Sequence, residues 1–513
     1  MSDWTSGYVA DIGYTYGYYI ELNPNRAKFA LLMNGYAPSP TGVHCELGFG
    51  QGLSVNIHAA ASGSTWYGND FNPSQAAFAQ TLTSASGANA NLTDEAFVEF
   101  CNRLDLPNFD SIGLHGIWSW ISDENRVVIV DFIRRKLKVG GVLYVSYNTL
   151  PGWASFSPMR HLMTEQAAVM GVVGNGVISQ VDSALEFAQK LLDTNPMYAK
   201  ANPGVVERLH KVSEQNRHYL AHEYFNKDWH PMYFATMGQW LAPAKLTFAC
   251  SAHYLDHIDA INLTPQQQAM LKEIPDPTFK ESVRDFMVNQ QFRRDYWVKG
   301  ELRLSPVEKE AQLCAQRVIL IVPRDDVNLK VKGTLLEADM KSEIYLPVLD
   351  LMADYEIRDI GEIYSALKSQ EISLANIIQV VLVMTATSQM ALAQEESVIA
   401  SSSETCLNLN LKILERARSS TTIPFLASPV TGGGIYVDQI HQLFLLSYLK
   451  SRTLPNEWAQ DAWQIFETQG RRFLKDGKEL KTEQDNLEEL MLQAKSFKEK
   501  NLKLIKQLKI IDF

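Results

Sequence analysis

Cysteine is scarce in this chain of 513 residues, and its few thiols are far apart. They belong to Cys45, Cys101, Cys250, Cys314 and Cys406, and no two form a CxxC pair. This spacing argues against a disulfide framework and against a thiolate zinc site. A reducing compartment, the cytoplasm, is therefore the expected location.

The sequence also lacks an excess of positive charge. It has 58 acidic and 47 basic residues, which gives a formal net charge of −11. A protein that binds the phosphate backbone of a nucleic acid needs a cationic face. Nucleic acid is therefore not an expected partner.

Signals for export and for membrane insertion are missing as well. Residues 1–19 are aromatic and polar, without the cationic and apolar regions of a secretory signal. The most apolar stretch, 372–393, is interrupted by polar residues that form one wetter helical stripe. This pattern predicts a buried helix and no membrane span.

What the sequence does contain is a regular alternation of short β-rich runs with helix-like segments. The runs that predict strands are 43–47, 65–70, 88–92, 109–114 and 142–147. Such alternation predicts a doubly wound α/β fold, in which a parallel sheet has helices on both faces. Ligands in such folds bind beyond the carboxyl ends of the strands, so residues that follow these runs are the first functional candidates.

The length of the chain predicts two to four domains. Residues 158–225 carry Leu, Ala and Met at helical spacing and predict a helical insertion, whereas the later runs 245–250 and 292–298 predict strands of the same sheet. The expected division is 1–157 for the ligand-binding core, 158–225 for the insertion, 226–300 for the segment completing the sheet, and 301–513 for a separate mixed α/β or mostly helical C-terminal domain.

A glycine-rich turn follows the first predicted strand. Residues 46–52 read E-L-G-F-G-Q-G, and Asp70 closes the second predicted strand. Glycines let the backbone turn sharply and approach a ligand, and a carboxylate at position 70 can accept hydrogen bonds from both hydroxyls of a ribose. Leu53 occupies the place of the third glycine of a dinucleotide fingerprint, and no phosphate-binding NTPase loop is present. The alternative is a turn that merely joins strand to helix.

The segments after the fourth and fifth predicted strands offer candidate catalytic residues. His115 is a candidate proton acceptor, and Trp118 offers a π face to a cation. The alternative is that His115 bonds the loop and the tryptophans pack a helix. Tyr147 and Asn148 follow the fifth predicted strand and are expected at the same rim of the sheet, where both are candidates. Asn148 can hold a neutral amine through its carbonyl oxygen, and the alternative is that it caps a turn before Pro151.

The aromatic run from Tyr14 to Tyr19 is a further candidate. A cage of tyrosines here, represented by Tyr16, would exclude water and bind a methylated ammonium. The alternative is an ordinary core strand.

Four motifs together resemble those of bacterial methyltransferases that carry a methyltransferase regulatory domain. They are E-L-G-F-G-Q-G at 46–52, H-G-I-W-S-W-I at 115–121, S-Y-N-T-L-P-G-W at 146–153 and F-R-R-D-Y-W at 292–297. That family includes the rickettsial outer-membrane-protein lysine methyltransferases. The resemblance covers residues 8 to about 299, and it implies a class I, Rossmann-like methyltransferase fold with S-adenosylmethionine as cofactor. The implied cofactor-binding residues are Glu46, Gly48, Phe49, Gly50, Gly52, Asp70, Phe71 and Asp94.

The leading functional expectation is methyl transfer to an amine, a protein lysine of a bacterial surface protein. One alternative is methylation of an oxygen or nitrogen of a small molecule or glycan, which a deep closed pocket beneath Tyr16 and Trp118 would favour. Another is an inactive methyltransferase fold that serves binding or regulation. The histidine pairs 218/222 and 253/257 lack a third ligand, so no metal is expected.

The apolar residues of the insertion leave two expectations for its role. Either it mediates a homodimer, through a face that includes Leu185 and Leu192, or it caps the active-site cleft of a monomer.

Overall fold

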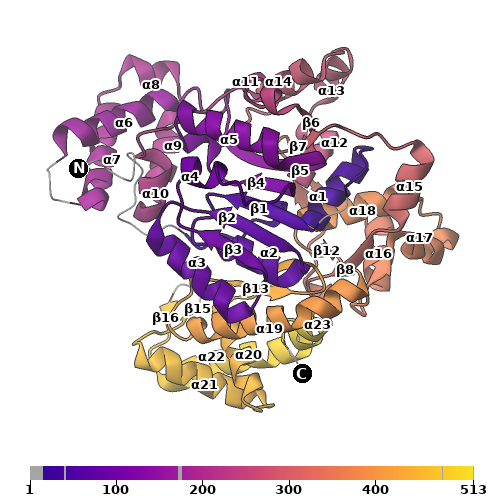
Figure 1. The fold of residues 1–513 in the computed structure, drawn as a ribbon. Helices are drawn as coiled ribbons and strands as arrows, with labels where there is room; N and C mark the ends of the chain where they lie inside the picture. The colour runs from indigo at the N-terminus through magenta and orange to yellow at the C-terminus, as the bar shows by residue number, and fades with distance from the viewer. Residues whose placement is uncertain (1–14, 40–41, 172–175, 476–477, 512–513) are drawn as a thin grey trace.

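A computed structural model describes residues 15–39, 42–171, 176–475 and 478–511. Tyr14, which begins the aromatic run, lies outside the described residues. In the described part of the chain, a central sheet lies between helices, and the C-terminal region packs along one side of it (Figure 1).

Seven strands form the central sheet, in the order β3-β2-β1-β4-β5-β7-β6. Their bounds are β1 Val43–Leu47, β2 Thr65–Asn69, β3 Ala90–Thr93, β4 Phe109–Leu114, β5 Leu137–Asn148, β6 Leu246–Ser251 and β7 Phe292–Lys299. Strands β1 to β5 are parallel, and β7 is antiparallel to both β5 and β6. The doubly wound α/β fold is confirmed, and both late runs join the sheet. The third and fifth predicted strands differ in their bounds, because β3 starts two residues later and β5 extends five residues further towards its start.

Helices cover both faces of the sheet. Those of the first 300 residues are η1 Ile20–Leu22, α1 Pro24–Met33, α2 Leu53–Ser62, α3 Pro73–Ser86, α4 Phe97–Cys101, η2 Trp118–Trp120, α5 Asp123–Lys136, α6 Ser157–Met170, α7 Gly176–Asp193, α8 Met197–Ala201, α9 Gly204–Ser213, α10 Arg217–Tyr224, α11 Phe234–Leu241, η3 Ala242–Ala244, η4 Tyr254–His257, α12 Asp259–Asn262, α13 Pro265–Lys272 and α14 Pro277–Met287. Successive strand residues belong to different cores: Leu143 and Val145 join the core of α4, α5 and α11, whereas Val142 and Tyr144 join that of α1, α2 and α3.

The predicted insertion is helical and has a hydrophobic core of its own, built by α6, α7, α9 and α10. Leu185 and Leu192 lie inside this core, with 6% and 5% of their surfaces exposed. The expected dimer contact through these two leucines is therefore wrong, because their side chains are already used to pack α7 against its neighbours. The end of α10 instead lines the same cavity as residues of α3 and α4.

The C-terminal region begins after β7 ends at Lys299, close to the expected boundary. Its elements are α15 Pro306–Cys314, β8 Arg317–Leu320, η5 Arg324–Asp326, β9 Lys330–Lys332, β10 Glu337–Asp339, α16 Ser342–Leu351, β11 Arg358–Asp359, α17 Ile360–Leu367, η6 Lys368–Gln370, α18 Leu374–Ala386, β12 Met390–Leu392, α19 Glu396–Ala417, β13 Phe425–Ser428, β14 Gly433–Tyr436, α20 Gln439–Leu449, α21 Pro455–Thr468, β15 Leu474–Lys475, β16 Lys478–Glu479, α22 Glu483–Ser496, η7 Phe497–Asn501 and α23 Leu502–Gln507. This region packs through α19 on α2 and α3, and its apolar interior is continuous with theirs.

The apolar stretch 372–393 forms the buried helix α18 followed by the short strand β12. Ser373 caps the helix by accepting a hydrogen bond from the backbone of Asn376. In the described part of the chain, no helix has the length and apolar character needed to cross a membrane.

Candidate functional site

A cavity of about 260 Å³ lies beyond the carboxyl ends of β1, β2 and β4. Its wall includes the segment before η1, the glycine-rich turn, the residues after β2 and β4, the start of α4, the segment from η2 to α5, and the residues at and just after the end of α10. The wall residues used below are Tyr19, Gly48, Phe49, Gly50, Gly52, Asn69, Asp70, Phe71, His115, Trp120, His222, Glu223, Asn226 and Asp228. The cavity therefore occupies the place that the strand pattern predicts for a ligand.

The glycine-rich turn shapes one side of the cavity through backbone conformations that side chains rarely adopt. Gly48, Gly50 and Gly52 have φ angles of +68°, +58° and +66°. A Cβ on Gly48 would lie 2.5 Å from the Cδ1 atom of Ile117, and one on Gly52 would lie 2.4 Å from the Cβ of Ala79. The turn therefore needs glycine for its conformation and for its close packing.

Asp70 closes the turn from the end of β2. Its Oδ2 atom accepts a hydrogen bond of 2.8 Å from the backbone N–H of Gly50, and its Oδ1 atom accepts one of 3.0 Å from Asn72. Burial raises the pKa of Asp70 to about 6, although these two N–H groups favour its charged form. At neutral pH the cavity wall thus carries a carboxylate fixed by the backbone.

Two buried polar atoms near this carboxylate have no hydrogen-bond partner among the described residues. They are the Oε2 atom of Glu46 and the Oδ1 atom of Asn69, in side chains that are each 1% exposed. Burial, together with the charge of Asp70, raises the pKa of Glu46 to about 8. Unsatisfied buried acceptors are costly, so a ligand that donates hydrogen bonds here would satisfy them.

His115 and Tyr19 form another part of the wall. Their rings stack with centroids 3.5 Å apart, and the Nδ1 atom of His115 lies 2.8 Å from the hydroxyl of Tyr144. Burial lowers the pKa of His115 to about 4, so the imidazole is neutral at physiological pH. In the tautomer whose Nδ1–H donates to Tyr144, the Nε2 atom of this neutral ring can accept a hydrogen bond from an incoming donor.

Several side chains selected from the sequence do not reach this cavity. Trp118 and Tyr147 are fully buried: the indole N–H of Trp118 contacts the sulfur of Met232, and the hydroxyl of Tyr147 donates to Asp295. Their expected position at the rim is therefore wrong, because both point into the core that contains α11. Trp120, two residues later in η2, lies on the wall instead.

Four further candidates also lie off the wall. Asn148 is 4% exposed at the end of β5, and the Nδ2 atom of its amide has no hydrogen-bond partner among the described residues. Tyr16 packs its ring against Phe78 and accepts a hydrogen bond from Arg416. Asp94 is exposed, and Glu46 lies on β1 behind the turn. The expected positions of Asn148, Tyr16 and Asp94 at the ligand are corrected accordingly, because Asn148 is buried, Tyr16 packs on Phe78 and Arg416, and Asp94 faces solvent.

The sequence interpretation considered the insertion as a cap but did not identify the residues in and after it that line the cavity. His222 and Glu223 at the end of α10, and Asn226 and Asp228 just after it, line the wall. They stand more than 100 residues after His115, and no motif marks them. The only signal was the spacing of His218 and His222, which we interpreted as a surface pair. The role of the insertion as a cap over the cavity is thus the one that the structure supports.

Comparison with known proteins places these features in context. A family model described as "Predicted methyltransferase regulatory domain" matches residues 216–299, which run from α10 through β7. The uncharacterized protein sll1526 of Synechocystis sp. is 39% identical over 513 residues. The aligned region covers 99% of this chain and 99% of that protein. The uncharacterized protein RP789 of Rickettsia prowazekii is 26% identical over 218 residues, which are 40% of this chain and 38% of that protein.

A solved structure is similar over almost the whole chain. PKMT2 from Rickettsia typhi, in complex with AdoHcy, superposes with a TM-score of 0.67 at 15% identity, over 94% of this chain and 98% of that one. At this identity the likeness shows the fold. The class I methyltransferase fold and the resemblance to methyltransferases with a regulatory domain are both confirmed.

Proposed function

Since this chain belongs to one family with the Synechocystis protein sll1526 and has the class I methyltransferase fold, we propose that it is an S-adenosylmethionine-dependent methyltransferase. The observation that carries the proposal is the cavity at the carboxyl ends of β1, β2 and β4, with its glycine turn and the fixed carboxylate of Asp70. Glycines without a Cβ leave room for a ligand against the backbone, and Asp70 matches a ribose.

The residues around the turn fit this donor. Asp70 would accept hydrogen bonds from the ribose hydroxyls, and Gly48, Gly50 and Gly52 would lie along the donor's amino acid part. The unpartnered oxygen of Asn69, a residue of the cavity wall, provides an acceptor for a donor N–H group, and the buried carboxyl of Glu46 lies behind the turn. When bound, S-adenosylmethionine would supply a methyl group that is activated by its sulfonium.

The opposite part of the wall suits an amine as the methyl acceptor. Glu223 and Asp228 contribute carboxylates that attract an ammonium, and the neutral ring of His115 can accept a hydrogen bond from the amine once the ammonium has lost its proton. Tyr19 and Trp120 surround this region with aromatic surface that excludes water. These side chains would align the nucleophile and desolvate it.

We favour a protein lysine as the acceptor, on the sequence resemblance to the rickettsial lysine methyltransferases and on the two acidic side chains of the wall. The alternative, a small-molecule or glycan acceptor, was to be recognised by a closed pocket under Tyr16 and Trp118. Neither side chain is among the described residues that line the cavity, which removes this argument for the alternative.

The proposal is tested by incubating the purified protein with labelled S-adenosylmethionine and a protein extract of its host. We expect label on lysine side chains, located by mass spectrometry. The initial rate should rise between pH 7 and 9, because a lysine ammonium with a pKa of about 10.4 must lose its proton before it attacks. Label found only in small molecules or glycans would favour the alternative, and no label with donor bound would indicate an inactive fold.

Donor binding should also release protons through Glu46. With a pKa of about 8, this carboxyl is mostly protonated at pH 7, and the positive groups of the donor favour its charged form. We therefore expect the affinity for S-adenosylmethionine to increase from pH 6 to pH 8, with release of up to about one proton at pH 7. Calorimetry in buffers of different ionisation enthalpy measures the release. Glu46→Gln should abolish it, and identical enthalpies for the natural protein in every buffer would contradict this assignment.

A further inference from the structure

An ion pair joins the matched regulatory segment to the wall of the cavity. Arg294 lies on β7, and its Nη1 atom donates to the Oε1 atom of Glu21 in η1 at 3.0 Å. From the same strand, the hydroxyl of Tyr296 donates to the backbone oxygen of Glu21 at 2.6 Å. Two residues of β7 therefore hold both the side chain and the backbone of Glu21.

Glu21 is well buried, with 9% of its side chain exposed. Burial opposes its ionisation, but the guanidinium groups of Arg294 and Arg26 outweigh that effect and hold the pKa of Glu21 below its ordinary value. The carboxylate of Glu21 is thus ionised and shielded from water, whereas the side chain of Arg294 is 35% exposed. Removing Arg294 leaves the buried charge of Glu21 less compensated, which is a larger change than losing a fully exposed pair.

Tyr19, a residue of the cavity wall, is linked to Glu21 by the chain and to α2 by hydrogen bonds. Tyr19 is two residues earlier in the chain, and its ring stacks on His115 at the cavity. Its backbone N–H donates to Ser54, and its backbone oxygen lies 3.1 Å from the Nε2 atom of His58. These contacts fix the segment on the side of α2, whereas Glu21 fixes it on the side of β7.

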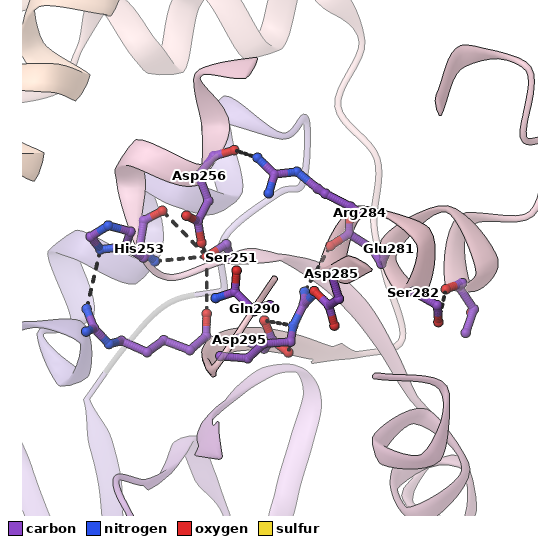
Figure 2. A network of polar contacts seen from close by, with 12 residues as sticks. Ser251, His253, Asp256, Glu281, Ser282, Arg284, Asp285, Gln290 and Asp295 are labelled. Carbon is purple, nitrogen blue, oxygen red and sulfur yellow. Dashed lines mark hydrogen bonds and ion pairs between the residues drawn. The ribbon is translucent and has the colours of Figure 1, made fainter. Parts of the chain in front are cut away.

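Arg294 is itself held by polar contacts within the regulatory segment. Its Nη1 atom lies 3.3 Å from the Nδ1 atom of His253. Figure 2 shows His253 beside Ser251, whose hydroxyl donates to Asp256, and Arg284 of α14 donates to the backbone oxygen of Asp256. A continuous set of contacts therefore runs from α14 through β6 and η4 to Arg294.

We propose that Arg294 and Glu21 are positioning residues, which hold Tyr19 against His115 and so set the acceptor side of the cavity from the regulatory segment. This inference deepens the proposed function and rests on it. Neither residue lines the cavity, so both act through Tyr19 and His115.

The charges of Glu21 and Arg294 shift the pKa of His115 in opposite directions. These opposite shifts distinguish a positioning role from general support of the fold. Glu21 raises the pKa of His115 and Arg294 lowers it. The polar groups that face this ring are Glu21 of η1, the hydroxyl of Tyr144 of β5, Arg294 of β7 and the stacked Tyr19. Arg294→Met should therefore raise the pKa of His115, whereas Glu21→Gln should not.

The test compares Arg294→Met, Arg294→Lys, Glu21→Gln and the double variant R294M/E21Q with Arg303→Met as the matched control. Arg303 also pairs with a glutamate at 3.0 Å, but its pair with Glu301 lies outside the cavity and its side chain is 56% exposed. Three quantities are measured: affinity for S-adenosylmethionine by calorimetry, the initial rate of label transfer into host proteins, and the His115 ring titration by NMR, assigned with His115→Gln.

We expect Arg294→Met and Glu21→Gln each to slow transfer at least tenfold while donor affinity changes less than threefold. Arg294→Lys should recover much of the rate, and the double variant should be no slower than the slower of the two single variants. Arg303→Met should stay within twofold of the natural protein.

An unchanged His115 titration in Arg294→Met would overturn the proposal even if the rate falls. If Arg294→Met does not fold, the nearly isosteric Glu21→Gln decides, and a rate within twofold of the natural protein overturns the proposal. If the natural protein transfers no label, the proposed function fails, while the titration still decides the positioning role.

Discussion

Replacing Asp70 by alanine is expected to weaken the binding of S-adenosylmethionine by about tenfold to a hundredfold or more. A hydrogen bond to a charged group contributes about 1.5–3 kcal/mol, and each 1.4 kcal/mol corresponds to a factor of ten in affinity. The same carboxylate also fixes the turn through the N–H of Gly50, so its loss leaves that donor unpaired. Titration calorimetry with S-adenosylmethionine measures the effect.

Asp94→Ala is the matched control for this variant. Both substitutions remove one aspartate carboxylate that follows a strand of the sheet, but Asp94 is exposed and lies off the cavity wall. We expect its donor affinity to remain within twofold of the natural protein. Equal affinities of Asp70→Ala and the natural protein would remove Asp70 from the binding site.

Replacing Gly50 by valine should have the larger effect and abolish measurable donor binding, a loss of more than about a hundredfold. Gly50 has a φ angle of +58°, a conformation that costs an L-residue roughly 1–2 kcal/mol, and a branched side chain here would also occupy space on the cavity wall. The expected loss combines strain of the turn with exclusion of the ligand. Calorimetry on the folded variant, verified by circular dichroism, measures it.

Gly87→Val separates the two causes of this loss. Gly87 has a similar φ angle of +68° at the end of α3, and a Cβ there meets nothing within 4 Å. We expect Gly87→Val to lose stability but to keep its donor affinity within threefold. A folded Gly50→Val protein that binds the donor as well as Gly87→Val does would contradict the assignment of the turn.

The glycine turn and its carboxylate could be recognised from the sequence because their constraints are local. A turn with three residues at positive φ favours glycine at each of these alternating positions, and Asp70 follows its strand directly. Gly48, Phe49, Gly50, Gly52, Asp70, Phe71 and His115 line one cavity, and their assignment as site residues stays a prediction.

The choice between neighbouring aromatic side chains was not readable in the same way. Trp118 and Trp120 are two residues apart in η2, and Tyr16 and Tyr19 are three apart before η1. Which member of each pair faces the cavity depends on the local backbone, a 3-10 turn for the tryptophans and an irregular segment for the tyrosines, and on the partners that bury the other member. Met232 and Arg416 are those partners for Trp118 and Tyr16, and both are distant in the chain.

The sequence by itself determined the alternation of strands and helices, the class of the fold and the loop that faces a ligand, because backbone preferences and hydrophobic periodicity act over a few residues. Only the tertiary structure decided that β7 lies between β5 and β6, that the end of the insertion caps the cavity, and that Arg294 reaches Glu21. The physical reason is the separation along the chain: Arg294 and Glu21 are 273 residues apart, and such pairs form only when the whole core packs.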